Sequence, residues 1–263
     1  MRTQTRNYTR RRKRGGSRLH RIFDFSEAHL LGVGGFGIAL SHVPNNAVKL
    51  LYDVDQCKAL IEEAQLQIAA KKLLDAKGIP VRVPRISAVL TEPVVWKGTP
   101  YLCGIAMERV QPPHGFTDPV HIILGEDDSD LNQHWGKTIS KPVGPNNPSR
   151  GFFASGDFLE DLWESEGRLH TVESVAYTMG AALRALVDGG IVPVDLEWIY
   201  GGDGNIHLID FGLCRFGRVD PTTFFYKKGR EGPASEIYNP HEGDYGWPEF
   251  VEGYFGKHIS YNV

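Results

Sequence analysis

The acidic residues around position 200 have the types and spacing of a metal-binding group. Glu197 and Asp210 lie thirteen residues apart, on either side of a predicted hairpin whose turn is residues 201–205. Two carboxylates held close together across a hairpin repel each other unless a cation lies between them, and carboxylate oxygens are ligands that Mg²⁺ prefers. The pair therefore predicts a divalent-cation site. The alternative is that Glu197 forms an ion pair with Lys49 or with an arginine.

A second group of residues, near position 35, has the composition of a phosphate-binding loop. Residues 31–37 fit the pattern G-x-G-x-x-G, with the glycines Gly32, Gly34, Gly35 and Gly37. A glycine-rich turn lets backbone N–H groups approach a phosphate, although glycine-rich hairpins without a ligand are commoner. The loop leads into a strand, whereas a dinucleotide-binding loop leads into a helix, so the sequence argues against a Rossmann fold.

Lys49 lies in the apolar segment that follows this loop, residues 46–51. A lysine among apolar neighbours is costly to bury without an anion nearby. The alternative is a lysine on an edge strand that faces water, and the position just after the glycine loop makes that alternative weaker.

Periodicity predicts the elements that must position these residues. Residues 30–51 alternate around two turns and predict a meander of strands. Residues 55–78 predict an amphipathic helix with Asp55 as N-cap and Gly78 as its end. The other predicted elements are strands within residues 83–90, 101–110, 197–200 and 206–209, and helices within 157–167, 171–188 and 247–255.

In this order the motifs resemble those of the protein-kinase-like superfamily. The glycine loop, Ala47-Val48-Lys49, an acidic helix, a strand that ends near Val110 and the Asp210-Phe211-Gly212 segment follow one another as they do in that superfamily. The resemblance implies an α+β, two-lobed fold. It places an antiparallel-sheet N-lobe with one main helix at residues 23–110, and a reduced, mainly helical C-lobe at residues 111–263 with an insertion at about 111–170.

The resemblance also implies a role for each candidate residue. Lys49 would hold the nucleotide phosphates and pair with a helix glutamate, Glu62 or Glu63, of which Glu63 is preferred because it follows the face predicted to turn toward the sheet. Met107 would lie behind the adenine ring. Backbone groups between Glu108 and Val110 would form hydrogen bonds with it. The four glycines of the loop would cover the phosphates.

The segment before Asp210 departs from the kinase pattern. Counted forward from the predicted catalytic residue Asp195, the position of the metal-binding Asn is Tyr200, a poor ligand for Mg²⁺. Counted back from Asp210, that position is Glu197, in a loop shortened by three residues. The second count predicts Asp210 and Glu197 as ligands of Mg²⁺ or Mn²⁺, with Asp195 accepting a proton from the acceptor hydroxyl or orienting it.

Two functions follow from the resemblance. The first is an atypical phosphotransferase that uses ATP and Mg²⁺ and acts on a protein or a small molecule, with transfer of either phosphate or AMP. The second is a weakly active or inactive pseudokinase that serves as a scaffold or assembly component.

The N-terminal 22 residues predict a flexible basic arm with a separate role. Residues 1–21 hold nine Lys or Arg and no acid, which leaves 20 basic and 32 acidic side chains in the rest of the chain. Such an arm predicts binding of residues 2–21 to nucleic acid or to an acidic protein surface, or a nuclear localisation signal. The alternative is a solvated tail. The arm resembles those of some large DNA virus proteins, which implies a virion-associated scaffold.

Composition limits the remaining possibilities. With 41% hydrophobic and 23% charged residues, the chain is typical of soluble globular proteins, and no apolar run approaches the roughly 18 residues that predict a membrane insertion. The N-terminus lacks the apolar segment of a secretory signal. The three cysteines, Cys57, Cys103 and Cys214, form no C-x-x-C pair, so we expect free thiols and an intracellular protein, cytoplasmic or nuclear.

Overall fold

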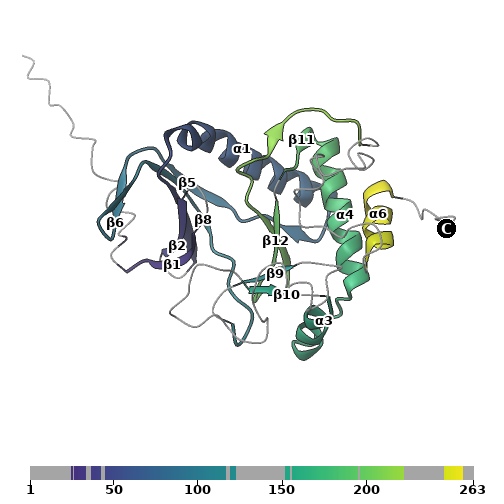
Figure 1. The fold of residues 1–263 in the computed structure, drawn as a ribbon. Helices are drawn as coiled ribbons and strands as arrows, with labels where there is room; N and C mark the ends of the chain where they lie inside the picture. Colours follow the sequence, from purple (N-terminus) through teal and green to yellow (C-terminus); the bar gives the residue numbers. More distant parts are fainter. Residues whose placement is uncertain are drawn as a thin grey trace, which may run out of the picture.

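The computed structural model describes residues 25, 27–33, 37–42, 45–116, 119–122, 152–154, 156–194, 196–221 and 246–256. These residues form a mixed α+β fold with two five-stranded sheets, two short strand pairs and four helices. Figure 1 shows the first sheet with the longest helix, α1, running from it toward the middle of the molecule, and the other three helices gathered on the opposite side.

The first sheet is antiparallel throughout, with the strand order β1-β2-β3-β8-β5. Its strands are β1 (His29–Val33), β2 (Gly37–His42), β3 (Asn46–Leu51), β5 (Ile86–Leu90) and β8 (Cys103–Glu108). The predicted meander is confirmed. The predicted strand at 101–110 is shorter, because a hairpin of β6 (Val94–Trp96) and β7 (Thr99–Tyr101) precedes it.

Helix α1 (Val54–Lys77) links this sheet to the rest of the molecule. Asp53 caps it by accepting hydrogen bonds from the backbone N–H groups of Asp55 and Gln56, so the N-cap predicted at Asp55 is wrong by two residues. Gly78 ends the helix as predicted, with φ of 66°, in the left-handed conformation that glycine adopts without strain.

The second sheet has the order β10-β9-β12-β13-β4. Its strands are β4 (Val81–Arg82), β9 (Val120–Ile122), β10 (Phe152–Ala154), β12 (Glu197–Tyr200) and β13 (Ile206–Ile209). The predicted hairpin of β12 and β13 is confirmed. Strands β9 and β10 come from the segment predicted to be an insertion, and the pairing of β11 (Ile191–Val192) with β14 (Arg215–Phe216) was not foreseen.

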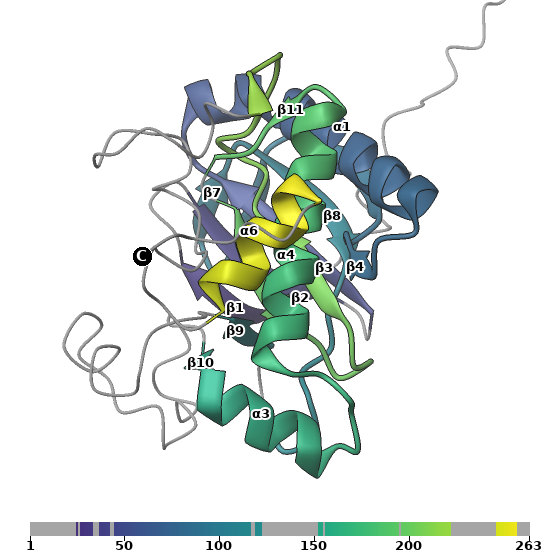
Figure 2. The same ribbon diagram turned by 90° about the vertical axis from the view of Figure 1, so that its right-hand side faces the viewer.

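The described residues after β10 include three helices, α3 (Gly156–Ser165), α4 (Val172–Asp188) and α6 (Trp247–Phe255). Figure 2 shows α6 lying across α4. Two glycines allow the two helices to cross this closely. A Cβ atom at Gly180 would lie 2.0 Å from the Phe250 carbonyl oxygen, and a Cβ atom at Gly253 would lie 2.0 Å from the Tyr177 carbonyl oxygen.

Among the described residues the apolar core forms three clusters, and α1 belongs to two of them. Its C-terminal half, with Leu66, Ala70 and Leu74, packs into the largest cluster beside α4 and the second sheet. Its N-terminal half, with Leu60 and Ala64, packs against one face of the first sheet. A separate cluster covers the opposite face of that sheet. Among the described helices, none has both the length and the apolar character needed to cross a membrane.

Cys57 and Cys103 form a disulfide, so the expectation of three free thiols is wrong. The two residues are 46 positions apart, which hid the pairing in the sequence. The β3–β8 register places Cys103 opposite Leu51, just before α1 begins, and this brings the first turn of the helix to the start of β8. Cys214 is buried and is not part of this disulfide.

Candidate functional site

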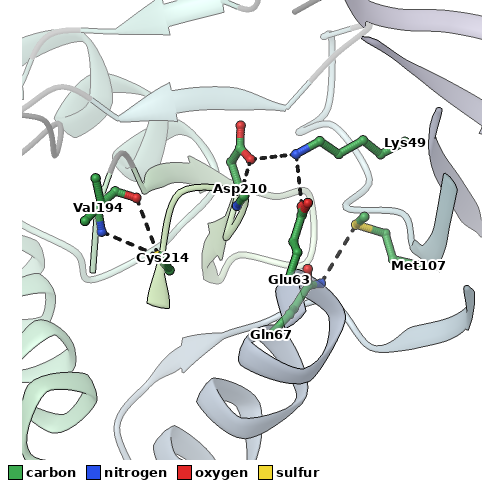
Figure 3. A network of polar contacts seen from close by, with 8 residues as sticks. Lys49, Glu63, Gln67, Met107, Val194, Asp210 and Cys214 are labelled. Carbon is green, nitrogen blue, oxygen red and sulfur yellow. Dashed lines mark hydrogen bonds and ion pairs between the residues drawn. The ribbon is translucent and has the colours of Figure 1, made fainter. Parts of the chain in front are cut away.

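Three of the predicted site residues meet at the Lys49 ammonium group. Its Nζ atom lies 2.9 Å from Glu63 Oε1 and 2.8 Å from Asp210 Oδ1. Figure 3 shows the three side chains pointing toward one another from β3, from α1 and from the end of β13. Glu63 is buried and Glu62 is exposed, so the prediction that Glu63 is the helix partner of Lys49 is confirmed.

The rotation of α1 that presents Glu63 is fixed by Gln67, one turn further along. Gln67 is buried, and its Nε2 atom donates a 2.7 Å hydrogen bond to the Pro84 carbonyl oxygen and lies 3.8 Å from Met107 Sδ. Because side chains four residues apart lie on one face of a helix, the contact of Gln67 with the segment before β5 holds Glu63 toward the sheet. Sequence reasoning missed this residue, since a buried Gln gives no signal in a periodicity argument.

The charges of this cluster keep Lys49 protonated. Burial by itself lowers the pKa of Lys49, but the neighbouring Asp210 and Glu63 carboxylates outweigh it and leave that pKa above its ordinary value. Burial raises the pKa of Glu63, and the adjacent Lys49 ammonium opposes this rise. Together the three groups hold one positive and two negative charges when both carboxyl groups are ionised, so the site can accept a further cation.

Asp210 has a backbone conformation that is uncommon for residues other than glycine. Its φ is 57°, in the left-handed region that Asp tolerates better than most residues but that still costs energy, and such strain concentrates at functional sites. Its Oδ1 atom accepts from Lys49 and, at 3.4 Å, from the Gly212 N–H. A Cβ atom at Gly212 would lie 3.3 Å from both Asp210 Oδ1 and Lys49 Nζ, so the glycine keeps the space beside this pair open.

Glu197 begins β12 directly opposite Ile209, the residue before Asp210. Its Oε2 atom lies 3.5 Å from His121 Nδ1. Although a carboxylate favours a charged imidazole, burial dominates and lowers the pKa of His121 to about 4, so His121 is neutral at pH 7 and does not offset the charge of Glu197. The alternative that Glu197 pairs with Lys49 is wrong, because the acidic partners of Lys49 are Glu63 and Asp210.

Tyr200 is not in a position to bind a metal ion. Its side chain is fully buried, and its hydroxyl donates a 2.5 Å hydrogen bond to Glu166 Oε2. Burial, followed by this hydrogen bond, raises the pKa of Tyr200 above its ordinary value. The forward count from Asp195, which put Tyr200 at the metal-binding position, therefore does not describe this hairpin.

The predicted adenine-binding segment, residues 107–110, includes the end of β8 and leads toward the second sheet. The N–H groups of Glu108 and Arg109 donate to the carbonyl oxygens of Arg85 and Asn45, both at 2.9 Å. Val110 forms no backbone hydrogen bond within the part of the chain that the structure describes. Of the residues predicted to bind adenine through the backbone, Glu108 therefore has its N–H group bonded within the fold.

The segment after Val110 passes closely over the β12–β13 turn. The Gly202 N–H donates a 2.7 Å hydrogen bond to the Gln111 carbonyl oxygen, and a Cβ atom at Gly202 would lie 2.3 Å from the Pro112 carbonyl oxygen. The glycines of this turn, predicted only as turn residues, thus also allow two distant segments to approach.

The glycine loop is described only at its two ends. Gly32 lies in β1 with open space around the position of a Cβ atom. Gly37 begins β2, where a Cβ atom would lie 2.0 Å from the Leu50 carbonyl oxygen, so strand packing by itself requires a glycine there. Gly34 and Gly35 lie outside the described residues, and so does Asp195.

Cys214 is a second residue that sequence reasoning missed. Its Sγ atom lies 3.5 Å from the N–H nitrogen and 3.4 Å from the carbonyl oxygen of Val194, as Figure 3 shows. The contact joins the segment that leads to Asp195 to the segment that follows Asp210.

Among the described residues, no group of three or more His, Cys, Asp or Glu side chains is arranged to hold a metal ion.

No protein-family model matches this sequence, and no curated protein is significantly similar to it. Any functional conclusion therefore depends on the geometry of the Lys49 site.

Proposed function

We propose that the protein is an atypical kinase-like phosphotransferase that binds ATP, together with Mg²⁺ or Mn²⁺, at the Lys49 site. The observation that carries this proposal is that the side chains of Lys49, Glu63 and Asp210 are in direct contact although they come from three different elements. Lys49 and Asp210 are 161 residues apart in the sequence. A five-stranded antiparallel sheet with α1 beside it, joined through residues 107–112 to a second sheet and three helices, supports a two-lobed kinase-like fold.

Lys49 would bind the phosphates of the nucleotide. A lysine between two carboxylates remains charged, and Glu63 holds its ammonium group from the buried side while Asp210 is the more exposed partner. An ammonium fixed in this way attracts phosphate oxygens without a large loss of side-chain freedom on binding. The fixed charge is the contribution of Lys49 to stabilising a transferring phosphoryl group.

Asp210 and Glu197 would hold the divalent cation. Both are carboxylates, the ligand type that Mg²⁺ prefers, and both side chains are partly exposed. Asp210 gives Oδ1 to Lys49, which leaves Oδ2 for a cation. When bound, the cation would supply positive charge that neutralises the phosphate oxygens. With two protein carboxylates, its coordination would be completed by phosphate oxygens and water, as is usual for Mg²⁺.

The remaining predicted residues would bind the adenine and the acceptor hydroxyl. Val110 would bind the edge of the adenine through its backbone, with Met107 behind the ring. Cys214 holds the backbone of Val194, the residue directly before Asp195, and Asp195 would orient the acceptor hydroxyl or accept its proton. The acceptor itself, protein or small molecule, is left open.

Label transfer from ATP tests the proposed reaction. We expect wild-type protein with Mg²⁺ to release or transfer the label of γ-labelled ATP, and Lys49→Ala to reduce this rate at least about a hundredfold, the usual effect of removing a group that stabilises transition-state charge. Lys58→Ala is the matched control, since Lys58 is an exposed lysine near the start of α1. Equal rates in wild type and Lys49→Ala would contradict the proposal. Transfer of the α-label instead would assign AMP transfer, and binding without transfer would assign the pseudokinase alternative.

A further inference from the structure

The Cys57–Cys103 disulfide is built into the same face of the first sheet as Lys49. In the β3–β8 register, Lys49 pairs with Ile105 and Leu51 pairs with Cys103. Side chains two residues apart along a strand share a face, so Lys49, Leu51, Cys103 and Ile105 all face α1. The disulfide therefore joins α1 to the sheet at Cys103, two residues along β8 from Ile105, which pairs with Lys49.

The two halves of α1 are anchored by different parts of the molecule. The C-terminal half packs into the large cluster through Leu66, Ala70 and Leu74. The N-terminal half has only a small cluster beneath it, to which it contributes Cys57, Leu60 and Ala64, and its outer residues Val54 and Ile61 are 58% and 53% exposed.

Glu63 lies where the two halves of α1 meet. Ala64 lies seven residues, or about two helical turns, after Cys57. Glu63 directly precedes Ala64. Loss of the disulfide would leave the turns before Glu63 held by few apolar contacts, and elements with few buried contacts open locally at low cost.

We propose that the Cys57–Cys103 disulfide is a reversible redox latch that holds the N-terminal half of α1 on the sheet and so controls formation of the Lys49–Glu63 pair. The oxidised protein is the state that binds nucleotide, and reduction weakens binding. This inference rests on the proposed function of the Lys49 site.

The redox step is a thiol–disulfide exchange with a dithiol, such as a thioredoxin-type protein. A thiolate of the dithiol attacks the sulfur of Cys57, which is half-buried, and Cys103, which is buried, leaves as a thiolate. The second thiol of the reductant then attacks the mixed disulfide. Two electrons and two protons pass to Cys57 and Cys103, and the dithiol becomes a disulfide; a disulfide oxidant reverses the exchange.

Hydrogen exchange and nucleotide binding, measured on the full chain with and without dithiothreitol, test the latch. On reduction we expect faster amide exchange over residues 54–63, unchanged exchange over residues 66–77, and about tenfold weaker binding of a non-hydrolysable ATP analogue, a typical size for coupling between two sites. Cys57→Ser should show the reduced behaviour without dithiothreitol. Lys58→Ala should keep the full response, since Lys58 is an exposed residue of the same helix and takes no part in the disulfide or the Lys49 site.

The outcomes separate the latch from the proposed function. Unchanged exchange over residues 54–63, or faster exchange with unchanged nucleotide affinity, would overturn the latch. Absence of nucleotide binding in both redox states would overturn the proposed function, and the exchange of residues 54–63 would then decide whether the disulfide holds the helix.

Discussion

At the scale of single residues, the site depends on which side chain faces the sheet. Glu62 and Glu63 are adjacent and chemically alike, yet only Glu63 is buried and in contact with Lys49. The helical face predicted this choice correctly. The sequence also offered two positions for the metal-binding residue. Tyr200 is buried with its hydroxyl bonded to Glu166, so Glu197 is the residue that we propose for this role.

Replacing Glu63 tests the ion pair against its neighbour. Glu63→Gln removes the buried negative charge beside Lys49, so we expect the free energy of unfolding to fall by about 1–2 kcal/mol and nucleotide affinity to fall about tenfold, the scale of one charged hydrogen bond. Glu62→Gln is the matched control and should change neither quantity, because Glu62 is exposed. Denaturant unfolding and calorimetry measure both. Equal effects of the two substitutions would show that the Lys49–Glu63 ion pair contributes no more to stability or nucleotide binding than an exposed glutamate does.

Replacing Gly212 tests the space beside the pair. In Gly212→Ala the new methyl group would lie 3.3 Å from both Lys49 Nζ and Asp210 Oδ1. We expect this crowding to weaken nucleotide binding and to lower the free energy of unfolding by about 1–3 kcal/mol. Gly217→Ala is the control, because its methyl group would meet Val192 Cγ2 at the same distance but away from the site. If Gly217→Ala weakens binding as much, the effect is a general loss of packing.

At the scale of elements, longer segments were predicted well and short ones poorly. Helices over 171–188 and 247–255 and the hairpin of β12 and β13 match the structure within a residue, because each carries its own periodicity and end signals. Strands β9, β10, β11 and β14 have two or three residues each and pair with distant partners. Segments this short contain no readable pattern, so tertiary pairing decides them.

The crossing of α4 and α6 gives a prediction at this scale. Gly180→Ala or Gly253→Ala would place a methyl group 2.0 Å from a carbonyl oxygen of the other helix. Alanine favours a helix over glycine by about 1 kcal/mol, but the backbone clash should dominate and lower the free energy of unfolding by about 2–3 kcal/mol. Gly32→Ala, whose Cβ would meet open space, is the control. Thermal unfolding measures the effect, and an unchanged or higher Tm in both helix variants would show that the helices can separate freely.

At the scale of the whole molecule, the sequence predicted the mixed α+β class and the order of the motifs. It could not predict the disulfide, because the proximity of Cys57 and Cys103 arises only when β8 pairs with β3. Nor could it predict that the segment after Val110 would lie over the β12–β13 turn, a contact that requires Gly202 for spatial reasons rather than for the turn. Both contacts join parts of the chain that periodicity treats separately.

The proposed nucleotide site is tested most directly by calorimetric binding of a non-hydrolysable ATP analogue, with and without Mg²⁺, to oxidised wild-type protein and to Asp210→Asn. If Asp210 holds the cation beside the phosphates, Mg²⁺ should tighten binding to the wild type at least about tenfold, and Asp210→Asn should lose that gain. Asp203→Asn, which removes a carboxylate at the turn between β12 and β13, should retain it. Wild-type binding that is absent, or no tighter than that of Asp210→Asn in the presence of Mg²⁺, would contradict the proposed role of Asp210 and the nucleotide site.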